Sequence, residues 1–290
     1  MSIPTCKGPD PATRAPRLVL PPLACDAHCH VFGPAAVFPY APDRAYTPPD
    51  APFEGLVALH AKLGVQRAVI VHASCHGSDM AVTLDGIARS GGAMKGVAVV
   101  DPGVTDADLA RLDAGGIRGV RFNFVKHLGG MPDMGFFQRV LAQVEPLGWH
   151  VVLHLDAEDI VPLAEVIRGI RIPFVIDHMG RVKAKLGLGQ PAFAQLLELM
   201  RNPLAWVKIC GAERVSSAGA PFTDAVPFAQ ALLAAAPDRC LWGTDWPHPN
   251  IAGDMPNDGD LVDLLGAMTD DTALIEQVTV ANPARLYWMR

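Results

Sequence analysis

Eight short β-branched runs alternate with eight helix-like stretches along most of the chain, and this alternation predicts a closed (β/α)8 barrel of the TIM type. Half of the 290 residues are hydrophobic, and no shift in composition marks a second domain. An open, doubly wound sheet is the less favoured alternative, because eight strand–helix pairs are the number that closes a barrel. We expect one barrel over residues 23–290 and an extended arm over residues 1–22, which hold six prolines.

The expected strands are apolar runs bounded by turn residues: 24–32, 67–73, 96–100, 117–124, 150–155, 174–176, 206–210 and 240–243. The expected helices show apolar residues at helical spacing: 53–63, 79–89, 106–113, 135–145, 158–168, 191–200, 224–235, and 260–268 with 271–280. Thr105 with Asp108 predicts a capping box, and Gly64 and Gly148 predict helix ends. The irregular segment 33–52 is long enough to be a loop over the mouth of the barrel.

The overall charge and the cysteine content limit the class of protein. A net charge of -6 and a pI near 5.9 argue against a general affinity for nucleic acid or acidic membranes. No apolar run approaches the roughly 18–20 residues of a membrane span, and the first ten residues lack the apolar core of a signal peptide. The six cysteines contain no C-x-x-C pair, which is typical of reduced thiols. We expect a cytoplasmic protein that binds neither nucleic acid nor membranes, and the oligomeric state is left open.

Polar residues gather where the expected strands end, which is where barrels of this kind carry their chemistry. Alternation along the first strand places His28 and His30 on one face, where two imidazoles can bind a metal or polarise a carbonyl. Seven of the ten histidines fall at strand ends. The polar residues at these ends are His28, His30, His72, Ser74, His76, Arg121, Asn123, His154, Asp156, Asp177, His178, Arg181, Lys208, Arg214, Thr244, Asp245, His248 and Asn250. The sequence therefore predicts one site at the carboxyl ends of the strands.

Several longer phrases extend this pattern. They include D-A-H-C-H-V-F-G-P from Asp26, V-I-D-H-M-G-R from Val175 and W-G-T-D-W-P-H-P-N from Trp242. With H-x-H on the first strand, His178 after the sixth and Asp245 after the eighth, the chain resembles the amidohydrolase superfamily over most of residues 24–288. Within it, the likeness is greatest to the lactone-hydrolysing branch of 2-pyrone-4,6-dicarboxylate lactonases. The resemblance implies hydrolysis of a carboxylated lactone such as 2-pyrone-4,6-dicarboxylate, in the degradation of lignin-derived aromatic compounds.

Roles for the site residues follow from the resemblance together with the chemistry of an ester. Asp245 would be the general base that activates water, and three imidazoles, those of His28, His30 and His178, would surround the carbonyl oxygen. Arg121 and Arg214 would take the carboxylates of a small anionic lactone. The other expected substrate contacts are Tyr46, Ser74, His76, Lys126, His127, His154, Arg181, His248 and Asn250.

Two departures from the family pattern leave alternatives open. The resemblance implies a metal-free enzyme, but His154 stands where that branch has a tyrosine, so His28, His30, His154 and Asp245 could instead hold one Zn²⁺. The cofactor is thus either none or one zinc. His127 replaces an arginine, which widens the substrate to a sulfonated muconolactone or a sugar-acid lactone. The remaining alternatives are a zinc-dependent decarboxylase of the same superfamily and a barrel that only binds an aromatic acid.

Overall fold

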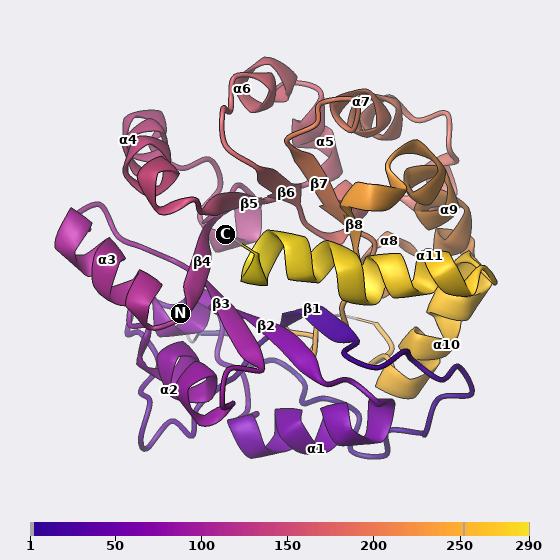
Figure 1. The fold of residues 1–290 in the computed structure, drawn as a ribbon, viewed down its shortest axis with the longest axis horizontal. Coiled ribbons are helices and arrows are strands. Elements are labelled where there is room, and N and C mark those ends of the chain that lie inside the picture. Colours follow the sequence, from indigo (N-terminus) through magenta and orange to yellow (C-terminus); the bar gives the residue numbers. More distant parts are fainter. Residues whose placement is uncertain (1–2, 252, 290) are drawn as a thin grey trace.

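Eight parallel strands in sequential order form the sheet of the computed structural model, which describes residues 3–251 and 253–289 (Figure 1). The strands are β1 (Cys25–Cys29), β2 (Arg67–Val71), β3 (Met94–Ala98), β4 (Ile117–Asn123), β5 (His150–His154), β6 (Phe174–Ile176), β7 (Ala205–Lys208) and β8 (Cys240–Leu241). Ala27 on β1 donates its backbone N–H to the carbonyl of Trp242 just beyond β8, over 2.9 Å. This bond joins the last strand to the first, so the predicted (β/α)8 barrel is confirmed.

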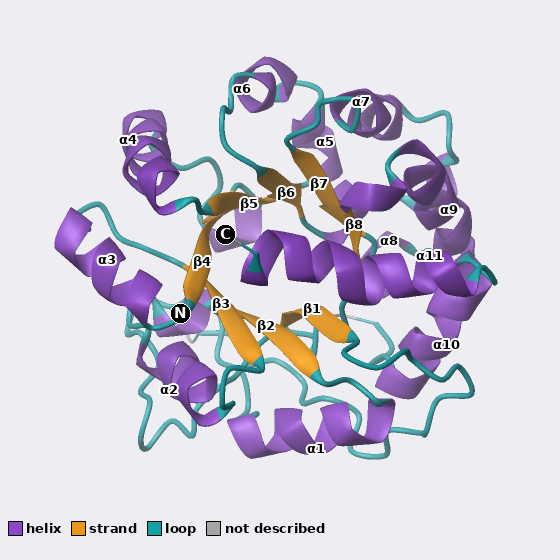
Figure 2. Cartoon of the chain, viewed as in Figure 1, coloured by secondary structure: helices purple, strands orange, loops and turns teal. Residues whose placement is uncertain are grey.

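All helices but the last form a ring outside the strands (Figure 2). The helices are α1 (Phe53–Leu63), α2 (Ala81–Arg89), α3 (Asp106–Ala114), α4 (Met134–Val144), α5 (Ala157–Ile160), α6 (Ala164–Arg168), α7 (Pro191–Leu199), α8 (Ala212–Val215), α9 (Val226–Ala235), α10 (Asp258–Met268) and α11 (Thr272–Glu276), which continues as a π-helix over Gln277–Ala281. The expected helix over 158–168 is split into α5 and α6. Pro162 lies at the break. Proline interrupts a helix because it has no N–H for a helical hydrogen bond and its ring crowds the preceding turn. The short helix α8 was not expected, since four residues are too few to show a periodicity.

The helix ends follow the sequence signals. Thr105 accepts the backbone N–H of Asp108, and the Asp108 carboxylate accepts that of Thr105, so the predicted capping box is confirmed. Gly64 adopts the left-handed conformation after α1 with φ 81°, and Gly148 does so after the turn that follows α4 with φ 65°. Glycine suits both positions because it has no Cβ to clash there.

The amino end of the barrel is sealed. The interior is packed with small and β-branched side chains from five strands, together with Trp206, Leu241 and Tyr287. The segment from α11 to the C-terminus crosses this end of the barrel (yellow in Figure 1), and Tyr287 packs its ring against that of His150 at the start of β5. Asn282 donates to the carbonyl of Cys240 at the start of β8. Access to the barrel interior is thus left to the carboxyl ends of the strands.

The described part of the N-terminal arm is extended and lies against two other segments. It forms a bridge between Thr5 and Thr47 in the 33–52 loop. Farther along, Arg17 Nε donates to Asp263 on α10 over 2.9 Å. The loop and the arm therefore pack together beside the carboxyl end of β1.

All six cysteines are free, and five of them are buried. Among residues 3–251 and 253–289, no helix has the length and the apolar character needed to cross a bilayer.

Candidate active site

Three imidazoles and one carboxylate converge at the carboxyl end of the barrel. His28 and His30 stand at the end of β1, His178 follows β6, and Asp245 follows β8. Nε2 of His30 lies 3.3 Å from Asp245 Oδ1, and Nε2 of His28 lies 3.5 Å from it. Nε2 of His178 lies 3.9 Å from the same oxygen. All four side chains are buried, and within the described chain Asp245 Oδ1 accepts no hydrogen bond. The residues expected to act at the reacting carbonyl therefore meet around one free oxygen atom.

Arg214 holds the other oxygen of Asp245. Its Nε donates to Asp245 Oδ2 over 2.8 Å, and its Nη2 donates both to this oxygen and to the carbonyl of Pro249. Burial is the largest effect and opposes the charge of Asp245, but Arg214 and the neighbouring histidines together hold the pKa of this carboxyl well below its usual range. Asp245 is thus an anion at neutral pH. The expected role of Arg214 as a clamp for a substrate carboxylate does not match this geometry, because its guanidinium is committed to Asp245.

A buried ion network lies behind His28. Asp177 Oδ1 is 3.2 Å from Lys208 Nζ, and Asp177 Oδ2 is 3.1 Å from Arg121 Nε. Lys208 Nζ is also 3.0 Å from His28 Nδ1. Burial alone would raise the pKa of Asp177, but its cationic neighbours, Lys208 first, hold it well below its usual range. Two buried cations share one carboxylate, and His28 is held in place from behind.

Burial also keeps three of the histidines neutral. For His28, burial and then the Lys208 ammonium lower the pKa to about 4. For His178 and His154, burial lowers the pKa well below the usual value of imidazole. Neutral imidazoles carry one N–H and one lone pair, so each ring can offer the reaction centre either a donor or an acceptor.

His154 and His127 lie at the edge of the cluster. The ring of His154 is 5.6 Å from that of His178, and its Nδ1 is 3.0 Å from Asn123 Oδ1. Nε2 of His154 has no partner in the described structure. The ring of His127 lies 6.3 Å from that of His154. These two imidazoles are placed to contact one side of a bound substrate.

Tyr46, Ser74 and Arg121 lie close to one another at the carboxyl ends of the barrel. Tyr46, from the 33–52 loop, is buried and hydrogen-bonded to Ser74, which follows β2. Arg121 on β4 is near enough for its charge to act on Tyr46. Burial raises the pKa of the Tyr46 hydroxyl, so this group is a hydrogen-bond donor.

Two of the expected substrate contacts are used inside the protein. His76 holds the 33–52 loop: its Nδ1 lies 3.2 Å from the carbonyl of Pro39, and its Nε2 accepts the N–H of Gly33 over 3.4 Å. His248 is buried, with Nε2 3.0 Å from Asp258 Oδ1. Their place at strand ends is as expected, but their ring nitrogens bind the protein.

Lys126 and Arg181 have different surroundings. Lys126 is exposed, and its ammonium forms an ion pair with Glu158. Arg181 pairs with Asp156 over 3.0 Å and also lines a cavity. Only the second of these cations is placed to meet a ligand at the barrel mouth.

The cavity lined by Arg181 has a volume of about 420 Å³. Arg214 and Asn250 line it as well, and so does Glu213, whose carboxylate is 3.4 Å from Arg214 Nε. Because Arg214 also binds Asp245, the cavity adjoins the four converging side chains. Its volume is in the range that small-molecule sites occupy.

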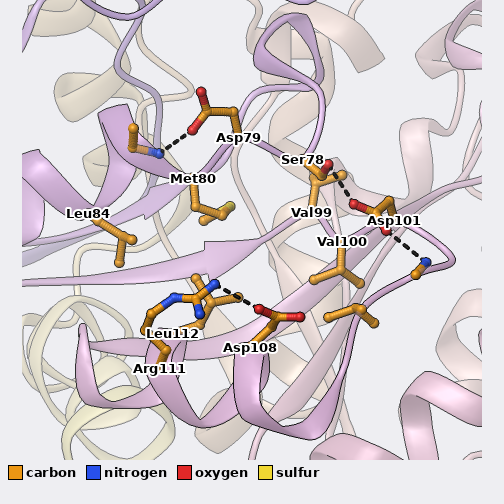
Figure 3. A pocket seen from close by; sticks show the side chains of 13 residues that line it. Ser78, Asp79, Met80, Leu84, Val99, Val100, Asp101, Asp108, Arg111 and Leu112 are labelled. Carbon is orange, nitrogen blue, oxygen red and sulfur yellow. Dashed lines mark hydrogen bonds and ion pairs between the residues drawn. The ribbon is translucent and has the colours of Figure 1, made fainter.

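A second cavity, of about 400 Å³, lies between α2 and α3 (Figure 3). Its acidic side chains are used within the protein. Asp79 caps the start of α2, Asp101 accepts the hydroxyl of Ser78, and Asp108 pairs with Arg111. The three carboxylates of this groove therefore serve the starts of α2 and α3 and their connections, and we assign the groove no catalytic role.

The residues do not fit the zinc site that the sequence left open as an alternative. His28, His30 and Asp245 offer ligand atoms within 4.8 Å of one another, but within the described residues His154 does not join that group. An ammonium group only donates hydrogen bonds, so His28 Nδ1 accepts from Lys208 and the ring proton lies on Nε2, the atom that faces Asp245. A protonated nitrogen has no lone pair for a metal.

Comparison with known proteins adds to this geometry. The model of the family described as Amidohydrolase matches residues 25–288. The chain belongs to the amidohydrolase family. A 4-sulfomuconolactone hydrolase of Rhizobium radiobacter is 42% identical over 98% of this chain and 96% of its own length. A 2-pyrone-4,6-dicarboxylate hydrolase of Comamonas testosteroni is 42% identical over 94% of this chain and 92% of its own length. A crystal structure from Pseudomonas putida, described as a 2-pyrone-4,6-dicarboxylic acid hydrolase, superposes with a TM-score of 0.82 at 31% identity, covering 93% of this chain and 99% of the other.

Three residues of this amidohydrolase site had no role in the sequence analysis. They are Asp177, Lys208 and Cys210, and all three are buried. A signal for Lys208 was present, because it is the one charged residue in the apolar run 206–210. A buried lysine needs a partner, but the sequence does not show which of several carboxylates provides it.

Proposed function

We propose that this protein is a lactone hydrolase that opens the ring ester of a small anionic lactone. The observation that carries the proposal is the free Oδ1 of Asp245, surrounded by the Nε2 atoms of three buried histidines. Such an arrangement offers one base for a water molecule and donors for the oxygen of a carbonyl group. The names of the two relatives at 42% identity support the ester of a lactone as the bond that is attacked.

The reaction needs no more than these groups. Asp245 accepts a proton from water as the water oxygen adds to the ester carbonyl. The negative charge that develops on the carbonyl oxygen is stabilised by imidazole N–H groups in a buried site, where such bonds are strong. The bond from the carbonyl carbon to the ring oxygen then breaks, and Asp245 returns the proton to the leaving oxygen. Water is consumed, the ring opens, and Asp245 is restored.

The anionic character of the substrate is supported by two arginines. Arg121 is buried, and its only ion pair in the described chain uses Nε, which leaves the two Nη atoms for a ligand. Arg181 lines the cavity of about 420 Å³. A guanidinium matches the oxygens of a carboxylate or a sulfonate, so both a 2-pyrone dicarboxylate and a sulfomuconolactone suit this site.

The cellular role and the compartment of the enzyme are part of the same proposal. We propose that the enzyme serves the degradation of aromatic compounds in the cytoplasm, as its resemblance to hydrolases of 2-pyrone-4,6-dicarboxylate and 4-sulfomuconolactone implies. The reduced state of all six cysteines agrees with that compartment.

Turnover of a lactone panel tests the function. The purified protein is incubated with 2-pyrone-4,6-dicarboxylate, 4-sulfomuconolactone and a sugar-acid lactone, and ring opening and proton release are followed together. We expect ring opening of at least one of the first two. Release of carbon dioxide from a substrate whose ring stays closed would favour the decarboxylase alternative and refute the proposal.

A further inference from the structure

We propose that Lys208 and Cys210 are positioning residues that fix the ring protons of His28 and His178 on Nε2. His30 is fixed in the opposite tautomer by a backbone carbonyl. The three similar histidines then have different roles: two donate to the carbonyl oxygen, and one accepts from the attacking water. This inference rests on the proposed lactone hydrolysis for its chemical meaning, but the positions of the protons can be measured without any substrate.

The tautomer of His28 follows from its neighbours on the Nδ1 side. Lys208 Nζ is 3.0 Å from Nδ1, and Asp177 Oδ1 is 3.3 Å from Nδ1. Lys208 is completely buried, and its charge is balanced by Asp177 at 3.2 Å. A proton on Nδ1 would point two donors at each other, whereas a lone pair there accepts from the ammonium. The proton therefore lies on Nε2, which faces Asp245.

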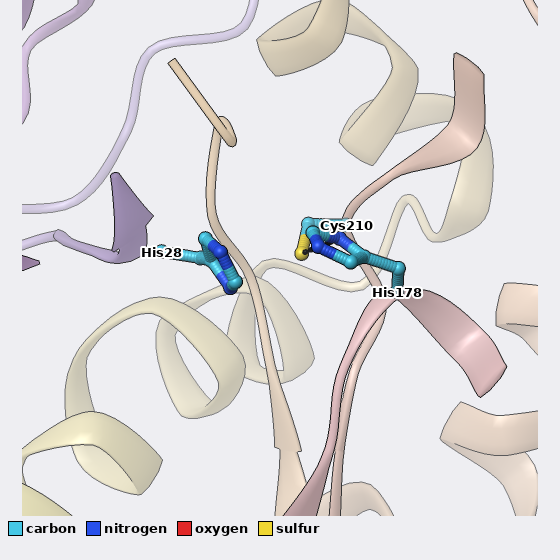
Figure 4. Close-up of side chains that lie close together, drawn as sticks. All are labelled: His28, His178 and Cys210. Atoms are coloured by element: carbon cyan, nitrogen blue, oxygen red, sulfur yellow. Dashed lines mark hydrogen bonds between the residues drawn. The ribbon is translucent and has the colours of Figure 1, made fainter. Parts of the chain in front are cut away.

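The tautomer of His178 follows from a thiol. Cys210 Sγ lies 3.4 Å from His178 Nδ1 (Figure 4). Burial raises the pKa of Cys210 well above its usual value, so the group is a thiol with a proton to donate. On the opposite side of the ring, Nε2 faces the carboxylate of Asp245 at 3.9 Å, which favours N–H there. Gly211 adopts φ 76°, and a Cβ at this position would lie 2.7 Å from His178 Nδ1, so the chain leaves room for this contact.

The tautomer of His30 is the reverse. Its Nδ1 is 2.7 Å from the carbonyl oxygen of Val71, which can only accept, so Nδ1 carries a proton. In the tautomer with this single ring proton, Nε2 presents a lone pair at 3.3 Å from Asp245 Oδ1, which is also an acceptor. A water molecule that donates one hydrogen to each of these two acceptors would satisfy both.

The different tautomers of the three histidines fix where the water and the carbonyl oxygen bind. The water is held by His30 Nε2 and Asp245 Oδ1, with its oxygen lone pair free to attack. The carbonyl oxygen receives the N–H groups of His28 and His178. As the water oxygen bonds to the carbonyl carbon, one proton moves to Asp245 and the new negative charge lies beside two donors.

Nitrogen-15 NMR of protein labelled in histidine measures the proton positions directly, because a ring nitrogen with a proton and one with a lone pair differ widely in chemical shift. Signals are assigned with the single variants His28→Asn, His30→Asn and His178→Asn. We expect a lone pair on Nδ1 of His28 and of His178 and a proton on Nδ1 of His30. A proton on Nδ1 of His28 or His178 in the wild-type protein would overturn the inference.

Variants at Cys210 separate positioning from packing. Cys210→Ala should leave His178 as a mixture of tautomers and lower kcat by up to about 10²-fold, the effect of losing one oxyanion donor, with KM nearly unchanged. Cys210→Ser should restore the tautomer and most of kcat, because a hydroxyl can donate in place of the thiol. Cys240→Ala removes an equally buried thiol at the amino end of β8 and should change neither. If the alanine and serine variants lose kcat equally while His178 keeps its tautomer, Cys210 has only a packing role.

Lys208→Met provides an independent test. Without the ammonium, Nδ1 of His28 should take the proton and donate to Asp177, which moves the lone pair to Nε2. An unchanged His28 spectrum in this variant would contradict the role of Lys208. If the variant does not fold, the wild-type spectrum still decides. The expected tautomers in a protein that opens no lactone would refute the proposed function alone, whereas lactone turnover with the opposite tautomers would refute this inference alone.

Discussion

Arg121 and Arg214 have the same side chain and reach the same end of the barrel, but the structure gives them different partners. Arg214 donates twice to Asp245, whereas Arg121 uses only its Nε, on Asp177. The contact of Arg214 stabilises the charge of Asp245, the proposed general base. The contact of Arg121 leaves its two Nη atoms for the substrate. The two arginines should therefore differ in which kinetic constant they control.

We expect Arg214→Met to lower kcat by roughly 10²–10⁴-fold, the contribution of a general base, because Asp245 would lose its charged partner. Arg121→Met should mainly raise KM, by roughly 10- to 100-fold, the cost of charged hydrogen bonds worth about 1.5–3 kcal/mol. Arg111→Met, on the exposed face of α3, is the control. Steady-state kinetics on the preferred lactone separate the two, and an Arg214 variant that changes only KM would argue against its role beside Asp245.

For individual residues, the sequence predicts which side chains lie together at the carboxyl end of the barrel but not which of them form hydrogen bonds or ion pairs with one another. Alternation and strand ends place His28, His30, His178 and Asp245 together without knowledge of the partners. Pairing depends on the register between neighbouring strands and on side-chain rotamers. For this reason the Lys208 contact with His28, across the barrel from β7 to β1, was not foreseen.

The junction between β1 and β8 is the element that positions Asp245. Asp26 on β1 is fully buried and accepts the N–H and the hydroxyl of Thr244 over 2.9 and 2.6 Å. It also accepts from the N–H of His28, over 3.0 Å, and its Oδ2 lies 3.1 Å from His60 Nε2. One carboxylate thus links both strands immediately before the two catalytic segments.

Asp26→Ala should lower the free energy of unfolding by about 3–5 kcal/mol, because it leaves several buried donors without an acceptor. Asp85→Ala, which removes an exposed carboxylate paired with Arg89, should cost no more than about 1 kcal/mol. Urea unfolding of both variants measures the difference. Equal stability of the two variants would show that the junction does not depend on Asp26.

The element boundaries show where local signals suffice. The bounds of α1 and β6 agree with the expected ranges, because apolar periodicity and flanking turns are properties of the local sequence. The break at Pro162 and the short α8 were missed. A single proline inside a periodic pattern can kink or end a helix, and the periodicity alone does not distinguish the two.

The whole molecule is a barrel with one sealed end and one reactive end. At the sealed end His150 is buried beside Tyr287, and near the mouth His72 is buried beside Thr83. Burial lowers the pKa of each imidazole to about 3. The unfolded chain binds protons at these groups from about pH 6.5 downward, whereas the folded chain does so only near pH 3. Stability should therefore be fully present above pH 6.5 and fall as the pH drops toward 3.

His150→Phe should reduce this acid sensitivity. Each such histidine costs about 3 kcal/mol of stability between pH 8 and pH 4.5, so the variant should lose less stability over this interval by about that amount. Urea unfolding at the two pH values measures it for the variant and the wild type. An identical loss in both would mean that His150 does not titrate as its burial implies.

The arrangement of the two ends shows what the sequence could predict of the whole molecule. The alternation of strands and helices predicts the barrel, and the carboxyl ends predict the site. The seal formed by the C-terminal segment was not expected, because its contacts with the starts of β5 and β8 join residues that are far apart in the chain.

The central claim is that Asp245 activates a water molecule for attack on a lactone carbonyl. It is tested most directly by a single turnover in ¹⁸O-labelled water, with enzyme in excess over 2-pyrone-4,6-dicarboxylate or 4-sulfomuconolactone. Mass spectrometry then locates the label in the product and in the peptide that contains Asp245, and Asp245→Asn, which should leave the ring closed, is the control. The account predicts one labelled oxygen in the new carboxylate of the product and none in Asp245. Label in Asp245 with an unlabelled product would show that the carboxylate itself attacks the ring, and would contradict it.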